Sequence, residues 1–225
     1  MAPRLIYLVR HGEIRRDDDL PRYVGQLDVP LSDAGRRQAR ELSRRFRLAG
    51  LGAIFSSDLE RSVETAQIIG AVVGLEPTKR RELREVSLGD WEGSALRDIE
   101  QRFPEQYRAR GEDFAGFHPP GGESFNDCGE RVVRAFHEIV RTTVGDVLIV
   151  GHASVNRLLL CHVLGMLPAN LFRLGQDYGC CNVIRCEGSR YQVTVVNGGP
   201  PDVRRQRAHV ARDRPPRRNA PEAKA

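Results

Sequence analysis

Short apolar runs alternate with amphipathic helical patterns along the first 200 residues, and this alternation limits the fold more than any other feature. The runs at 5–9, 53–56 and 146–150 are short and almost continuously apolar, which is typical of strands buried on both faces. Each is followed by apolar residues at helical spacing. The pattern predicts an α/β fold, a three-layer sandwich with a mostly parallel central sheet and helices on both faces. The helical patterns lie at 32–49, 57–74, from 124 onward, and at 155–164.

Two of the predicted helices begin with capping signals. Ser57 stands three residues before Glu60, and Ser124 stands three residues before Asp127. A hydroxyl and a carboxylate at this spacing can satisfy each other's free backbone N–H groups, so each pair predicts a capping box. A shorter helical pattern, over 94–103, ends before a proline.

Two further segments lack a helical pattern. Residues 104–123 are rich in Gly and Pro and show no clear period, so we predict an irregular loop that roofs the site like a lid. The runs 181–185 and 191–196 flank a turn and predict a hairpin at the edge of the sheet. Pairing of that edge with a second copy of the chain, which would give a homodimer, is left open.

The basic charge is concentrated at the C-terminus. Residues 201–225 carry eight Lys or Arg against three Asp or Glu, a net +5 that equals the charge of the whole chain. We therefore divide the chain into one domain, 1–200, and a disordered basic tail, 201–225. We interpret the tail as a solubilising extension and expect no nucleic-acid partner; docking to RNA or anionic surfaces is the alternative.

The composition excludes several classes of protein. No apolar run approaches the roughly 20 residues of a bilayer-spanning helix, and the first run is too short for the core of a signal peptide. The five cysteines lack CxxC spacing, so neither a zinc knuckle nor a disulfide framework is indicated. We expect a cytoplasmic protein without a membrane partner.

Two histidines directly follow predicted strands. Arg10 and His11 come after the run 5–9, and His152 comes after the run 146–150. Ligands of parallel sheets bind in the crevice beyond the carboxyl ends of the strands, so both histidines should share one crevice. The guanidinium of Arg10 has donors that match phosphate oxygens. The pair of histidines with an arginine predicts a site for a phosphorylated ligand.

Four stretches in this order, LVRHGE, SSDLERSVETAQII, LREVSLGDWEG and VGHASVNRLLL, resemble the histidine phosphatase superfamily, which has the phosphoglycerate mutase-like fold. The resemblance extends from residue 5 to about residue 197. It implies that His11 is the nucleophile that forms a phosphohistidine and that Glu85 is the general acid. It further implies that Arg10, Arg61 and His152 hold the phosphoryl group. No metal and no organic cofactor belong to this chemistry.

The residue types fit these roles on physical grounds. A neutral imidazole can attack phosphorus, and cationic side chains can stabilise the charge that spreads over the transferring phosphoryl group. Arg61 falls in the first turn of a predicted helix, where a cation opposes the helix dipole, which favours a functional role. Gln26, in VGQLDVPLS, lies in a region that touches the phosphoryl group in relatives, and its amide could donate to phosphate.

The reaction subtype is predicted from the stretch around Glu85. LREVSLGDWEG is similar to the phosphatase branch of the superfamily, and residues 155–184 resemble α-ribazole phosphatases and their broad-specificity relatives. The expectation is a metal-independent phosphomonoesterase for a small phosphorylated metabolite, such as α-ribazole 5'-phosphate or a sugar phosphate. A phosphoglycerate mutase-type transfer and a non-catalytic protein that docks phospho-ligands are the alternatives. Ile14 stands where the family often has threonine. This difference bears on which substrate binds and not on the reaction itself.

Overall fold

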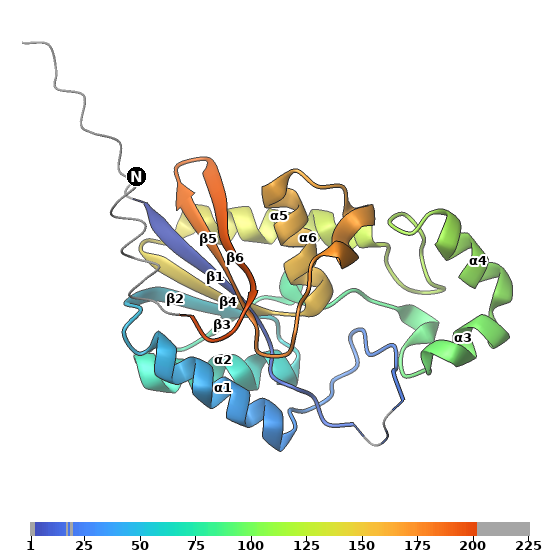
Figure 1. The fold of residues 1–225 in the computed structure, drawn as a ribbon, viewed down its shortest axis with the longest axis horizontal. Helices are drawn as coiled ribbons and strands as arrows, with labels where there is room; N and C mark the ends of the chain where they lie inside the picture. Colours follow the sequence, from blue (N-terminus) through green and yellow to red (C-terminus); the bar gives the residue numbers. More distant parts are fainter. Residues whose placement is uncertain (1–2, 17, 19, 202–225) are drawn as a thin grey trace, which may run out of the picture.

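A six-stranded sheet forms the centre of the fold, in the order β3-β2-β4-β1-β5-β6 (Figure 1). This computed structural model describes residues 3–16, 18 and 20–201. The strands from β1 to β4 pair in parallel, whereas β5 runs antiparallel to β1 and to the edge strand β6. The predicted mostly parallel sheet and its edge hairpin are confirmed. The strands are β1 (Arg4–Arg10), β2 (Leu51–Ser56), β3 (Thr78–Lys79), β4 (Asp146–Gly151), β5 (Cys181–Glu187) and β6 (Arg190–Gly198).

Two pairs of helices cover the two faces of the sheet. Alternate side chains of β1 point to opposite faces, so Tyr7 packs among the apolar residues of α1 and α2, whereas Leu8 packs among those of α5 and α6. The three-layer sandwich predicted from the alternating pattern is confirmed. The covering helices are α1 (Asp33–Phe46), α2 (Glu60–Val73), α5 (Phe125–Thr142) and α6 (Ala153–Leu164).

Two short helices stand outside the three layers. The helices α3 (Leu96–Arg102) and α4 (Pro104–Glu112) lie at one end of the molecule, beyond the carboxyl end of β1 (Figure 1). The expectation of an irregular loop from residue 104 was wrong for the segment that forms α4. Pro104 occupies the first turn, where proline is tolerated, and α4 has no buried residue, so it shows no apolar period. The described part of the chain also contains three 3₁₀ helices: η1 (Arg81–Leu83), η2 (Gly89–Trp91) and η3 (Pro168–Arg173).

The two predicted capping boxes have different outcomes. At the start of α5 the box is present, since the hydroxyl of Ser124 accepts from the N–H of Asp127 and the carboxylate of Asp127 accepts from the N–H of Ser124. The box expected at Ser57 was wrong. The helix α2 begins at Glu60, and the N–H of Glu60 donates to the carboxylate of Asp28 at 2.7 Å. The hydroxyl of Ser57 is therefore available for another contact.

The predicted basic tail, apart from residue 201, lies outside the described residues. Among the helices that are described, none combines the length and the apolar content needed to cross a membrane.

Candidate active site

The ends of β1 and β4 bring the two histidines together. Arg10 and Gly151 are register partners, and the N–H of His11 donates to the carbonyl oxygen of Gly151 at 3.0 Å. The rings of His11 and His152 stand edge to face with their centroids 5.1 Å apart. His11 is 4% exposed and His152 is 0% exposed. Both imidazoles therefore lie at the carboxyl ends of the strands, as expected, although only His11 of the two lines the cavity described below.

Gly12 permits the chain to leave β1 against the helical layer. A Cβ atom on Gly12 would lie 2.4 Å from the carbonyl oxygen of Gly35 in α1, so only glycine fits at this approach. The N–H of Gly12 donates to the hydroxyl of Thr65 in α2 at 3.1 Å. These contacts fix the backbone on the C-terminal side of His11.

The imidazole of His11 is neutral and has a defined tautomer. Burial lowers the pKa of His11 well below its ordinary value, and the positive charges of Arg61 and Arg10 lower the pKa further. The Nδ1 atom lies 2.7 Å from the carbonyl oxygen of Gly12, which can only accept a hydrogen bond. The proton is therefore on Nδ1, and Nε2 carries the lone pair.

Arg61 is a buried cation held by carbonyl oxygens. Its two terminal nitrogens donate to Leu27 at 2.6 Å and to Gly25 at 2.7 Å, and the side chain is 1% exposed. Burial lowers the pKa of Arg61, but a guanidinium keeps its charge in proteins. Both of these partners are neutral, so the positive charge of Arg61 is available to an anion.

Arg10 is positioned by the loop before β5. Its Nη1 donates to the carbonyl oxygen of Gln176 at 2.6 Å, and its guanidinium lies 3.7 Å from the ring centre of Tyr178. The Tyr178 ring is also 5.6 Å from the ring of His11. Sequence reasoning missed Tyr178, because no apolar period or charge pattern marks this loop.

His152 is oriented by Ser57. The Nε2 atom of His152 lies 2.7 Å from the hydroxyl oxygen of Ser57, and that oxygen also accepts from the N–H of Leu59 at 3.4 Å. The hydroxyl proton can then be donated to Nε2, which leaves the ring proton on Nδ1. Burial lowers the pKa of His152 well below its ordinary value, and the charge of Arg61 contributes. Among the described residues, Nδ1 of His152 has no hydrogen-bond partner, so it is a free donor.

Glu85 lies on the loop that follows η1. Its two carboxylate oxygens accept from the N–H of Val86 at 3.0 Å and from the N–H of Ser154, in the first turn of α6, at 3.2 Å. The contact with Ser154 connects the carboxylate to the chain segment that carries His152.

Arg131 of α5 holds the Glu85 loop through its backbone. Arg131 donates to the carbonyl oxygens of Glu85 at 3.0 Å and Glu82 at 2.7 Å. It also forms a two-pronged ion pair with Glu123, with distances of 2.5 and 2.9 Å, and Glu123 accepts from the N–H of Ser87. The ion pair thus anchors the backbone on both sides of Glu85.

Gln26 also contacts the Glu85 loop. Its Nε2 donates to the carbonyl oxygen of Glu85 at 2.9 Å, and its own N–H donates to the carboxylate of Glu92 at 2.9 Å. The amide that was expected to reach phosphate is directed here to the backbone of Glu85, and its contact with phosphate stays a prediction.

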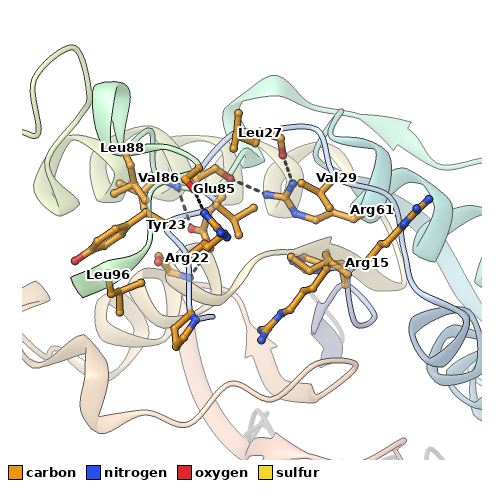
Figure 2. Close-up of a pocket in the computed structure, with 18 of the residues that line it drawn as sticks. Arg15, Arg22, Tyr23, Leu27, Val29, Arg61, Glu85, Val86, Leu88 and Leu96 are labelled. Carbon is orange, nitrogen blue, oxygen red and sulfur yellow. Dashed lines mark hydrogen bonds between the residues drawn. The ribbon is translucent and has the colours of Figure 1, made fainter. Parts of the chain in front are cut away.

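Four of the predicted residues, Arg10, His11, Arg61 and Glu85, line one cavity of about 620 Å³ (Figure 2). Figure 2 shows Tyr23, Val86 and Leu88 grouped on one side and Arg61 on the other. The cavity thus has a cationic end beside the histidines and an apolar wall beyond Glu85. Such an arrangement can bind a phosphoryl group and surround the organic part of an ester.

No group of three or more His, Cys, Asp or Glu side chains within 3–16, 18 and 20–201 is placed to hold a metal ion. Arg10 and Arg61 bring positive charge to the cavity beside His11, and Arg15, Arg16 and Arg22 also line it.

The comparisons with known proteins agree with this geometry. The model of the histidine phosphatase superfamily (branch 1) matches residues 6–198. Phosphoserine phosphatase 1 of Hydrogenobacter thermophilus is 31% identical, over 85% of this chain and 91% of that protein. The adenosylcobalamin/α-ribazole phosphatase of Escherichia coli is 30% identical, over 85% of this chain and 95% of that protein. A crystal structure of a putative α-ribazole-5'-P phosphatase from Escherichia coli superposes with a TM-score of 0.80 at 28% identity, covering 88% of this chain and 97% of that chain.

Proposed function

Because the chain belongs to the histidine phosphatase superfamily and is a phosphatase, we propose that it hydrolyses a small phosphomonoester through a phosphohistidine on His11. The observation that carries this proposal is that a neutral imidazole, two guanidinium groups and one carboxylate line the same cavity. The relatives that act on phosphoserine and on α-ribazole phosphate supply two candidate esters. A sugar phosphate is a third.

In the first half-reaction, Nε2 of His11 forms a bond to phosphorus while the bond from phosphorus to the ester oxygen breaks. The protonated carboxyl of Glu85 gives its proton to the departing oxygen, so that an alcohol leaves. Arg10, Arg61 and Nδ1 of His152 stabilise the charge on the phosphoryl oxygens. Because the site has preorganised donors and cations, the chemistry needs no metal ion in this proposal.

In the second half-reaction, the carboxylate of Glu85 takes a proton from a water molecule, and the oxygen of that water attacks phosphorus. The bond from Nε2 to phosphorus breaks, inorganic phosphate forms, and His11 returns to its neutral state. One carboxylate serves both half-reactions, since the proton that Glu85 gives to the leaving alcohol in the first is replaced by the proton that it takes from water in the second. The contact of Glu85 with the N–H of Ser154 keeps the carboxylate at the histidine end of the cavity.

The test is phosphate release from a panel of esters in the presence of EDTA. The panel contains α-ribazole 5'-phosphate, O-phosphoserine, glucose phosphates and 3-phosphoglycerate. We expect release from at least one ester, a loss of about 10⁴-fold or more in His11→Ala, and unchanged release in His137→Ala, whose histidine is exposed on α5.

Other outcomes would contradict the proposal. Phosphate release that persists in His11→Ala would exclude a phosphohistidine intermediate on His11. Isomerised phosphoglycerate that retains its phosphate would indicate a mutase, and binding without turnover would indicate a docking protein.

A further inference from the structure

A second, smaller cavity adjoins the catalytic one and has an aromatic lining. Its volume is about 120 Å³, and it shares Tyr23, Val86, Leu88 and Ser154 with the wall of the catalytic cavity. The two hollows therefore adjoin at these shared residues. The remaining residues of the small cavity come from α4, from the segment between α4 and α5, from the start of α5 and from η3: Arg110, Phe114, Phe117, Pro119, Glu123, Phe125 and Phe172.

Three phenyl rings form the core of this aromatic cavity. The ring centroids of Phe114 and Phe125 are 5.0 Å apart in a stacked arrangement, and Phe172 lies 5.3 Å from Phe114 and 6.0 Å from Phe125. Arg110 also borders the cavity, with its guanidinium 4.6 Å from the ring centre of Phe114. Phe125 is 8% exposed, but Phe172 is 56% exposed although it packs against two rings. An aromatic cluster that is open on one side offers flat apolar surface to a ligand.

The position of the cavity assigns it to the leaving group. Ser154 borders both hollows, and its N–H donates to the carboxylate of Glu85. Under the proposed function, Glu85 gives a proton to the ester oxygen, so the organic part of the ester begins beside this carboxylate. Figure 2 shows Val86, Leu88 and Tyr23, which border the aromatic cavity, on the side of Glu85 away from Arg61.

We propose that the aromatic cavity is a subsite for an apolar six-membered ring, aromatic or saturated, carried by the leaving group of the substrate. This inference rests on the proposed function, and it names the class of ester that this chain prefers. The volume agrees, because an apolar cavity of roughly 150 Å³ in another protein accepts benzene. The three phenyl rings offer no hydrogen-bond partner, so a hydroxyl group buried against them is unfavourable.

The substrate series that tests this inference holds the reacting bond constant. Benzyl, cyclohexylmethyl and ethyl phosphate all release a primary alcohol, so differences in kcat/KM report how the organic part binds. We expect benzyl and cyclohexylmethyl phosphate to exceed ethyl phosphate by about 10-fold to 100-fold, because each ring removes apolar surface from water. Glycerol 3-phosphate, which is polar, should resemble ethyl phosphate.

Two variants connect the preference to the cavity. Phe172→Ala and Phe114→Ala should each lower kcat/KM for benzyl phosphate by about 10-fold and leave ethyl phosphate within about 2-fold. Phe172 is more than half exposed, so its replacement should leave the unfolding temperature almost unchanged. Leu167→Ala is the matched control, since Leu167 is 70% exposed and stands just before η3. It should have no effect on either ester.

Equal kcat/KM for benzyl and ethyl phosphate in the parent protein would overturn the inference. A ring preference that persists in both phenylalanine variants would also overturn it. These outcomes differ from failure of the proposed function, in which no ester is turned over or turnover survives in His11→Ala.

Discussion

The site has two halves that are built differently. The half that holds the phosphoryl group consists of side chains at strand ends and at the start of α2, and three of them, His11, Arg61 and His152, are at most 4% exposed. The half that receives the leaving group consists of the Glu85 loop, α3, α4 and η3, and α4 has no buried residue. The phosphoryl half is fixed by the core of the fold, whereas the leaving-group half depends on contacts between distant segments. The residues that bind the phosphoryl group are therefore separated from those that contact the leaving group.

Removal of a cation from the phosphoryl half should have the largest effect. We expect Arg61→Met to lower kcat by about 10²-fold to 10³-fold, because a preorganised charged donor to the transition state is lost. The loss should be equal for benzyl and ethyl phosphate and should be accompanied by weaker inhibition by inorganic phosphate. Arg36→Met, which removes a surface partner of Glu64, is the control. A loss of kcat that differs between benzyl and ethyl phosphate would contradict the division of the site into two halves.

Loss of the support behind Glu85 should have a smaller effect that depends on the leaving group. In Arg131→Met the backbone around Glu85 loses its donor and its ion pair with Glu123, so the carboxyl is misplaced. We expect kcat for ethyl phosphate to fall by about 10-fold to 100-fold, and kcat for p-nitrophenyl phosphate, whose leaving group needs no proton, to fall much less.

Arg134→Met, on the exposed side of the same helix, is the control and should keep both activities. Equal losses for both esters in Arg131→Met would mean that Arg131 supports the fold rather than Glu85. Glu85→Gln should show the same dependence on the leaving group. If Glu85→Gln shows no such dependence, the assignment of Glu85 as the general acid is wrong.

The two buried histidines should make stability depend on pH. Burial holds the pKa of His11 and His152 in the folded protein well below the ordinary value of 6.5, at which they titrate when the chain is unfolded. Below about pH 6.5 the unfolded state binds more protons, so stability is complete above that pH and is lost as the pH falls. Each histidine should contribute a slope of about 1.4 kcal/mol per pH unit.

Denaturant unfolding of the parent protein and of His11→Asn between pH 8 and pH 5 measures this slope. Other titrating groups cancel in the difference between the two proteins. Identical slopes would show that His11 takes up a proton in the folded state.

The smallest expected effect concerns Ser57. In Ser57→Ala the Nε2 atom of His152 loses its 2.7 Å partner, and the ring tautomer is no longer fixed. We expect kcat to fall by about 5-fold to 10-fold with KM almost unchanged, since one neutral hydrogen bond contributes roughly 1 kcal/mol. Ser57→Thr, which keeps a hydroxyl, should recover most of the activity. A loss in Ser57→Thr as large as in Ser57→Ala would contradict this role.

The same division explains what the sequence could predict. The apolar runs located β1 and β4, and the residues that follow a parallel strand must lie at its carboxyl end, so His11 and His152 were predictable. The spacing of Ser57 to Glu60 fits a helix cap and predicts one. The spacing cannot show that Asp28 supplies the cap and that the hydroxyl contacts His152.

The leaving-group half could not be predicted from local sequence patterns. The helix α4 has no buried residue and therefore lacks an apolar period, so its sequence predicts a loop. The contact of Arg131 with Glu85 spans 46 positions, and no spacing rule links two such residues. Similarly, Phe114 and Phe172 meet only because the segment after α4 lies against η3 in the folded chain.

The most direct test of the central claim is to trap the phosphorylated enzyme. The protein is mixed rapidly with a turned-over ester, the reaction is stopped in alkali, where phosphohistidine survives, and the phosphorylated peptide is identified by mass spectrometry. The account predicts phosphate on the peptide that contains His11, formed at least as fast as turnover and absent in His11→Asn. Turnover without any covalent phosphate, or phosphate on a residue other than His11, would contradict it.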